Sequence, residues 1–127
     1  MSAIDLTGKR YWLVGAGDGL GRALAHHMSR AGIELTVSSR GADKLASLVD
    51  ELPGKATAQT VDISDDASVA AAAEAIGDID GLVLLAGVYW PFSAREWNAE
   101  EGVAMADVNF TGFMRVQIGR ASCRERV

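Results

Sequence analysis

The stretch V-G-A-G-D-G-L-G, residues 14–21, joins the apolar run Tyr11-Trp12-Leu13-Val14 to a segment whose apolar residues have helical spacing. Glycines at such a junction let the backbone adopt positive φ and approach a ligand closely. The helix that follows directs free N–H groups and the positive end of its dipole at an anion. The stretch therefore predicts a phosphate-binding turn with a pyrophosphate at the start of the helix. A glycine-rich turn without a ligand is the alternative, although ordering three glycines on folding would cost backbone entropy that no bound ligand would offset.

The spacing of the glycines indicates which class of phosphate-binding turn this is. Gly15, Gly19 and Gly21 fit G-x-x-x-G-x-G, whereas the usual dinucleotide pattern G-x-G-x-x-G would need glycine at Leu20 or Arg22. No Gly-Lys-Ser/Thr follows, which excludes a Walker loop. A strand-loop-helix methyltransferase stays open, but it would be expected to carry an acidic residue where Val14 stands. The candidate ligand-binding residues of the turn are Gly15, Gly17, Asp18, Gly19, Leu20 and Gly21.

Composition limits the class of protein. The chain has 127 residues, of which 49% are hydrophobic, and no apolar stretch approaches the twenty residues that span a bilayer. We expect a soluble domain or part of one, without membrane association. The N-terminus lacks a basic region followed by an apolar core, so a cytoplasmic location is expected. The lone Cys123 cannot form an internal disulfide. With a net charge of −5 and a dense basic cluster only at the C-terminus, binding to nucleic acid has little support.

The last ten residues, 118–127, form a segment of different character. They resemble the in-frame translation of a sequencing-library adapter, so we expect a non-native tail there and a natural reading frame up to Gln117. Removing the three Arg and one Glu of this segment changes the net charge from −5 to −7. A genuine basic tail is the alternative.

Strand-like and helix-like patterns alternate along the chain. Strands are predicted over residues 10–14, 33–37, 56–61 and 82–85, the last of them fully buried. Helices are predicted over 19–31, around 45–52, from an N-cap at Ser64 to Gly77, and over about 96–117. This order predicts an α/β fold, a Rossmann-like doubly wound parallel sheet with strand order 3-2-1-4. The sheet would be incomplete, with later strands missing beside the fourth. In the first helix we expect a buried face made of Leu20, Leu24, Met28 and Ala31.

The glycine-rich turn resembles the cofactor loop Thr-Gly-x-x-x-Gly-x-Gly of the short-chain dehydrogenase/reductases, with Val14 at the position of the threonine. Three further stretches add to the resemblance. Asp62-Ile63 resembles an Asp-Val/Leu pair, Leu84-Leu85-Ala86-Gly87 matches the second half of Asn-Asn-Ala-Gly, and residues 108–112 resemble Val-Asn-x-x-Gly. The resemblance covers residues 1–117 and implies that they are the N-terminal part of an NAD(P)-binding Rossmann domain.

The resemblance also implies roles for these residues. Asp62, with Ile63 beside it, would accept a hydrogen bond from the adenine amino group, although an acid that merely forms a turn is an alternative for Asp62. Ala86 and Gly87 would let the backbone approach the nicotinamide ribose. Asn109 is the one catalytic candidate: it would sit at a helix irregularity, where its backbone carbonyl holds a water of the proton relay. A buried amide or a local kink is the alternative for Asn109.

The residues after the second predicted strand indicate the cofactor. An NAD-preferring site would place Asp or Glu there for the ribose hydroxyls, whereas this chain has Ser38-Ser39-Arg40. Ser39 can donate a hydrogen bond to a 2′-phosphate and Arg40 can pair with it, so the sequence predicts NADP(H), with NAD possible. A solvated arginine at a helix start is the alternative.

The family's remaining catalytic residues, Ser and Tyr-x-x-x-Lys, are not found in the sequence. Tyr11 is followed four positions later by Gly15, and Tyr89 by Ser93. The resemblance therefore implies that the parent protein is an NADP(H)-dependent oxidoreductase and a homo-oligomer, moving hydride between nicotinamide and a small-molecule carbonyl or alcohol, with this chain an inactive fragment. A non-catalytic NAD(P)-binding sensor is the alternative. No metal site is expected, because His26 and His27 have no Cys or carboxylate at ligand spacing.

Overall fold

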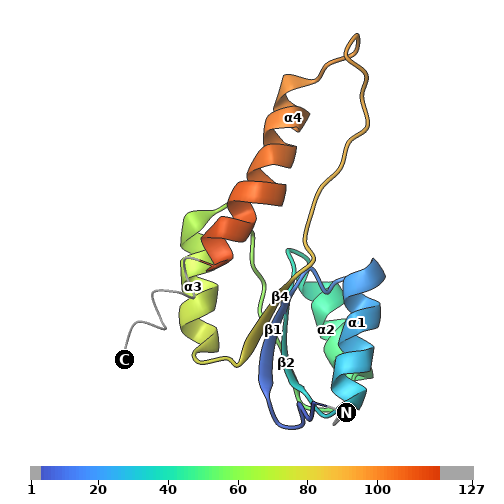
Figure 1. Ribbon diagram of the computed structural model, residues 1–127, viewed down its shortest axis with the longest axis vertical. Coiled ribbons are helices and arrows are strands. Elements are labelled where there is room, and N and C mark those ends of the chain that lie inside the picture. The colour runs from blue at the N-terminus through green and yellow to red at the C-terminus, as the bar shows by residue number, and fades with distance from the viewer. Residues whose placement is uncertain (1–3, 118–127) are drawn as a thin grey trace.

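The computed structural model describes residues 4–117, which contain a four-stranded parallel sheet (Figure 1). The strands are β1 (Arg10–Val14), β2 (Glu34–Ser38), β3 (Ala56–Ala58) and β4 (Gly81–Leu84). Their order is β3-β2-β1-β4, and every neighbouring pair is parallel. The predicted fold class and strand order are therefore confirmed.

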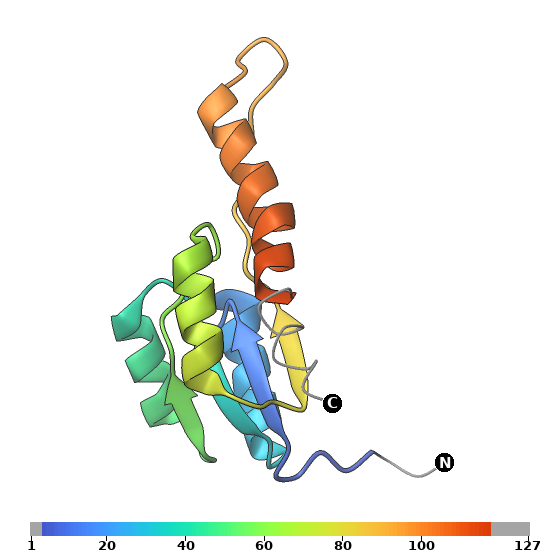
Figure 2. The same cartoon turned by 90° about the vertical axis from the view of Figure 1, so that its left-hand side faces the viewer.

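Helices cover both faces of this sheet. Helices α1 (Gly19–Arg30) and α2 (Ala42–Glu51) pack on one face, and α3 (Asp66–Ile76) packs on the other (Figure 1). After β4 a long loop leads to α4 (Ala99–Ala106), which runs directly into a π-helix, η1 (Asp107–Thr111). Figure 2 shows that this loop and α4 extend away from the sheet. The fold is thus a three-layer α/β domain with one arm, formed by α4 and η1, whose α4 end projects from the domain.

The core consists of two clusters, one on each face of the sheet, because alternate residues of β1 point in opposite directions. Leu13 joins the cluster under α1 and α2, while Trp12 and Val14 join the cluster under α3. The indole N–H of Trp12 donates to Ser38 Oγ at 2.8 Å, so the polar atom of this fully buried ring has a partner. The central strand thereby fixes both layers of helices.

The buried face of α1 differs from the predicted one. Met28 is buried and Leu24 packs half-buried against the core, as predicted. Leu20, however, is 73% exposed and Ala31 is also exposed, and their places on the buried face are taken by Gly21 and Ala25. The reason is the close approach of Gly21 to the preceding turn, where a Cβ on Gly21 would collide with the carbonyl oxygen of Gly15. This contact sets the rotation of the helix and turns Leu20 toward solvent.

The predicted full burial of the fourth strand is wrong. Residues 81–84 are only half-buried, and Leu85 lies beyond the strand with 37% of its surface exposed. Within the described residues β4 pairs with β1 alone, which leaves its other edge open. Within the described residues, the apolar run 82–85 therefore belongs to an edge strand.

Some element boundaries also differ from the predicted ones. Asp65, and not Ser64, is the N-cap of α3, because its carboxylate accepts from Ala67 N. Helix α4 begins at Ala99, where Asn98 caps it by accepting from Glu101 N. Strand β2 begins one residue later than predicted, since Ile33 N still donates to Met28 O in the turn that closes α1.

Candidate functional site

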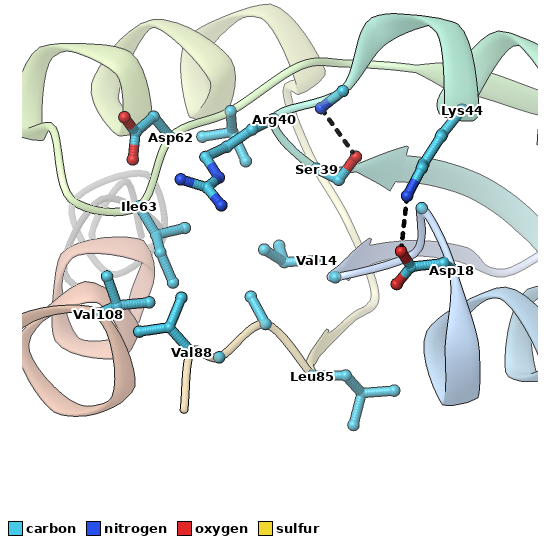
Figure 3. Close-up of a pocket in the computed structure, with 16 residues that line it drawn as sticks. Val14, Asp18, Ser39, Arg40, Lys44, Asp62, Ile63, Leu85, Val88 and Val108 are labelled. Carbon is cyan, nitrogen blue, oxygen red and sulfur yellow. Dashed lines mark hydrogen bonds and ion pairs between the residues drawn. The ribbon is translucent and has the colours of Figure 1, made fainter. Parts of the chain in front are cut away.

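A cavity of about 340 Å³ lies at the carboxyl ends of the strands. This is where ligands collect in open parallel sheets, between a central strand and neighbours whose connections run in opposite directions. The residues around it come from the end of β1, the loops after all four strands, the first turn of α2 and η1 (Figure 3). Those predicted from the sequence are Gly15, Gly17, Asp18, Ser39, Arg40, Asp62, Ile63, Ala86 and Gly87.

The glycine-rich turn has backbone features that favour glycine. Gly15 has φ +98°, and a Cβ there would lie 2.5 Å from Ala86 N. Gly19 has φ +57°, and a Cβ there would meet no atom within 4 Å. Glycine at position 15 lets the turn pack against the backbone that follows β4. The space around Gly19, at the start of α1, is open. Gly19, Leu20 and Gly21 do not line the cavity itself.

The start of α1 has the chemistry of an anion site. Asp18 is its N-cap, but the Asp18 side chain makes no cap hydrogen bond and the first turn carries no acidic residue. The N–H groups of this turn are thus not covered by a side-chain carboxylate. Asp18 Oδ2 instead accepts from Lys44 Nζ at 2.8 Å. This hydrogen bond and the charge of Lys44 lower the pKa of Asp18.

The end of β2 provides polar and cationic groups. Ser39 Oγ accepts a hydrogen bond from Gly41 N at 3.3 Å, which leaves the hydroxyl hydrogen for another partner. The side chain of Arg40 extends across the cavity toward Asp62 (Figure 3). Residues 38–41 contain no carboxylate. This end of the cavity therefore favours a negatively charged group.

Asp62 both forms a turn and lines the cavity. Its Oδ1 accepts from Ser64 N at 3.0 Å and from Ser64 Oγ at 2.6 Å. These two hydrogen bonds are the main reason that the pKa of Asp62 is lowered, with smaller contributions from the charges of Arg40 and Arg115. The predicted turn role is therefore present alongside a carboxylate at the cavity wall.

Asn109 lies within η1, at a helix irregularity of the kind that the family resemblance implies. Its Oδ1 accepts from Val88 N at 2.8 Å, and its Nδ2 donates to Val88 O at 2.7 Å. Asn109 is exposed and does not line the cavity. In this structure it holds the segment after β4, including Gly87, against the helix, and its catalytic role stays a prediction.

Lys44 was not singled out from the sequence, although it lines the cavity. It lies in the first turn of α2, where the positive end of the helix dipole disfavours a cation. A lysine in the first turn of a predicted helix is therefore unusual, and this was the sequence signal from which Lys44 could have been found. The apolar wall was not predicted either, because its residues come from segments far apart in the sequence: Val14, Val61, Leu85, Val88 and Val108.

The aromatic residues of the loop after β4 and the histidines of α1 do not line the cavity. Phe92 packs edge-on against Trp97, with ring centroids 4.7 Å apart, and Tyr89 is exposed. His26 Nε2 lies 3.2 Å from Glu51 Oε2. Within residues 4–117 no helix is both long and apolar enough to cross a bilayer. The predictions for residues 118–127, including Cys123, lie outside the described residues.

Comparison with known proteins gives concordant matches. A sulfoacetaldehyde reductase of Chromohalobacter salexigens is 33% identical over 112 residues, which are 83% of this chain and 44% of that protein. A D-erythrulose reductase of Gallus gallus is 34% identical over 113 residues, covering 89% of this chain and 46% of that protein. The chain thus spans less than half of the length of either relative.

Solved structures and a whole-family comparison agree. A short-chain type dehydrogenase/reductase from Mycobacterium marinum superposes with a TM-score of 0.87 at 28% identity, covering 94% of this chain and 51% of that one. Residues 9–120 match the family described as short chain dehydrogenase. The chain therefore belongs to the short-chain dehydrogenase family.

Proposed function

We propose that this chain is the cofactor-binding part of an NADP(H)-dependent oxidoreductase that acts on a small-molecule carbonyl or alcohol. The observation that carries the proposal is the end of β2, where Ser39 and Arg40 line the cavity in place of a carboxylate. A carboxylate at this position would repel a 2′-phosphate, whereas a hydroxyl and a guanidinium can bind it. Family membership supports an NAD(P) cofactor in general.

The residues present fit such a cofactor. The start of α1, with Gly15, Gly17 and Gly19, would hold the pyrophosphate, because its backbone N–H groups are uncapped by side chains and no Cβ blocks the approach. Arg40, Asp62 and Ile63 would hold the adenine end. Ala86 and Gly87 would lie beside the nicotinamide ribose, where the absence of large side chains leaves the backbone accessible. When bound, the nicotinamide supplies or accepts the hydride.

The substrate class follows by analogy with the named relatives, which are reductases of small carbonyl compounds by name. We propose that this chain binds cofactor but does not turn over substrate, since its sequence contains no Tyr-x-x-x-Lys to act as general acid. Asn109 would contribute the backbone carbonyl freed by η1, while its side chain holds Val88.

Calorimetric titration of the chain with NADPH and NADH tests the proposal. We expect NADPH to bind about tenfold more tightly or better, and Arg40→Ala to remove most of this preference, as expected for a charged hydrogen bond. Arg30→Ala is the matched control, because Arg30 is an exposed arginine at the far end of α1. Equal or tighter binding of NADH would exclude the NADP(H) preference. Binding of S-adenosylmethionine in place of either nucleotide would favour a methyltransferase.

One observation favours a second candidate, a non-catalytic NAD(P)-binding sensor. Leu84 and Leu85 replace polar residues that the family pattern has there, and Leu85 lines the cavity. Sequencing of the source DNA past the codon for Gln117 distinguishes the two. A continuation with Ser and Tyr-x-x-x-Lys supports the oxidoreductase, and a continuation without them supports the sensor.

A further inference from the structure

The ion pair between Asp18 and Lys44 is a feature of the cavity that the proposed function leaves unassigned. It joins the glycine-rich turn to α2, two segments 26 residues apart, and both residues line the cavity. Their side chains are 78% and 63% exposed, so each can reach a ligand in the cavity mouth. An exposed pair of this kind contributes little to stability, so stability alone does not account for it.

Lys44 and Ser39 meet at the same point of the turn. A Cβ on Gly17 would lie 3.0 Å from Ser39 Oγ and 3.8 Å from Lys44 Cβ, so both residues border this glycine. Figure 3 places Ser39 between Lys44 and Arg40, with the two cationic side chains reaching into the cavity from opposite sides of the serine. A phosphate beside Ser39 would therefore have a cation on each side.

The backbone around Lys44 is held independently of its side chain. Arg22 Nη1 donates to Gly17 O and to Lys44 O, both at 3.2 Å, and Arg22 Nη2 lies 2.8 Å from Glu51 Oε1. The start of α2 thus stays fixed to the turn even when the ammonium group changes partner. Only one N–H of that group is needed by Asp18, and an ammonium has three.

We propose that Lys44 is a second cation for the 2′-phosphate, a determinant of cofactor specificity that acts with Arg40, and that Asp18 tethers its ammonium group beside the site. This inference rests on the proposed NADP(H) binding. A different role for Lys44 would be to neutralise Asp18, so that any pyrophosphate could approach the start of α1. The two roles differ in which ligand loses affinity when Lys44 is changed.

The test compares adenosine 2′,5′-bisphosphate with adenosine 5′-monophosphate, which differ only in the 2′-phosphate, by calorimetry on the full chain. We expect Lys44→Gln to weaken the bisphosphate about fivefold and the monophosphate less than twofold. We expect the same selective loss when Lys44→Gln is added to Asp18→Asn and the double variant is compared with Asp18→Asn alone. Lys55→Gln is the matched control, since Lys55 is also exposed and paired, with Glu34, at the opposite end of the strands.

Each outcome has a distinct meaning. Equal losses for both nucleotides, vanishing in the Asp18→Asn background, would show that Lys44 only neutralises Asp18 and would overturn the inference. So would an unchanged preference in Lys44→Gln alongside a reduced preference in Arg40→Ala, which would leave the proposed function intact. A parent chain that does not prefer the bisphosphate would overturn both.

Discussion

The turn between β1 and α1 and the arm formed by α4 and η1 both border the cavity, yet their packing differs greatly. In the turn, Gly15 and Gly21 are in such close contact with neighbouring backbone that neither has room for a Cβ. In the arm, neither α4 nor η1 contains a buried residue, and Val103 and Phe110 are largely exposed. The turn is part of the sheet's own core, whereas the arm is held by a few side-chain contacts.

This difference has a consequence for the site. The groups that would bind phosphate and adenine lie in the closely packed half, on segments fixed by strands β1, β2 and β3. The residues proposed to lie beside the nicotinamide, Ala86 and Gly87, directly precede Val88, whose backbone is held by Asn109 of η1. We therefore expect the proposed phosphate and adenine contacts and the proposed nicotinamide contacts to depend on different parts of the fold.

The largest expected effect is that of Gly21→Ala. Its Cβ would collide with the carbonyl oxygen of Gly15, which neither backbone can relieve without moving the turn. We expect a loss of about 3 kcal/mol in the free energy of unfolding, measured by urea denaturation. Gly102→Ala in α4 is the control, because there the Cβ would lie 3.2 Å from the ring of Trp97, which can shift. Similar losses in both variants would contradict the difference in packing.

Arg115→Gln is expected to loosen the arm. Arg115 donates to Asp107 in η1 and to the carbonyl of Ile63, and it also bonds Asp66 at the start of α3. It therefore links residues 112–117, which continue the helix after η1, to α3 and to the loop after β3. We expect a fall in Tm of roughly 5 °C, with faster amide exchange in 99–117 than in 10–51. Equal acceleration in both segments would mean that the arm is not held separately.

The pH dependence of stability should identify the same link. The hydrogen bond from Arg115 is the main cause that lowers the pKa of Asp107. A carboxyl whose pKa is lowered in the folded state stabilises the fold above its unfolded pKa, near 3.9, and this contribution is lost as pH falls through the folded pKa. Asp107→Asn should therefore be less stable than the parent at pH 7, and this deficit should shrink below about pH 4.

Urea denaturation at pH 7 and pH 3 measures that deficit. Asp18, Glu51 and Asp62 also have lowered pKa values, so only the difference between variant and parent isolates Asp107. In the Arg115→Gln background the Asp107→Asn substitution should give no pH-dependent difference. A deficit that persists unchanged at pH 3 would assign the stabilising role of Asp107 to something other than its charge.

Sequence reasoning succeeded where the signal is local. The glycine pattern at residues 15–21 and the polar residues that directly follow the strands located the cavity, because the carboxyl ends of parallel strands meet at one edge. It failed where a distant contact decides. The rotation of α1 depends on Gly21 meeting Gly15, and the place of Lys44 depends on Asp18. Likewise, nothing local to Asn109 indicates that Val88 is its partner.

The smallest expected effect concerns the exposed side of the arm. Phe110 is 69% exposed, so Phe110→Ser removes little buried apolar surface and should change the free energy of unfolding by less than about 0.5 kcal/mol. Phe113, three residues on, is half-buried against the cluster under α3, and Phe113→Ser should cost about 2 kcal/mol or more. Urea denaturation of the two variants tests the contrast within one helix. If Phe110→Ser costs as much as Phe113→Ser, Phe110 is covered in solution, which would contradict the exposed arm described above.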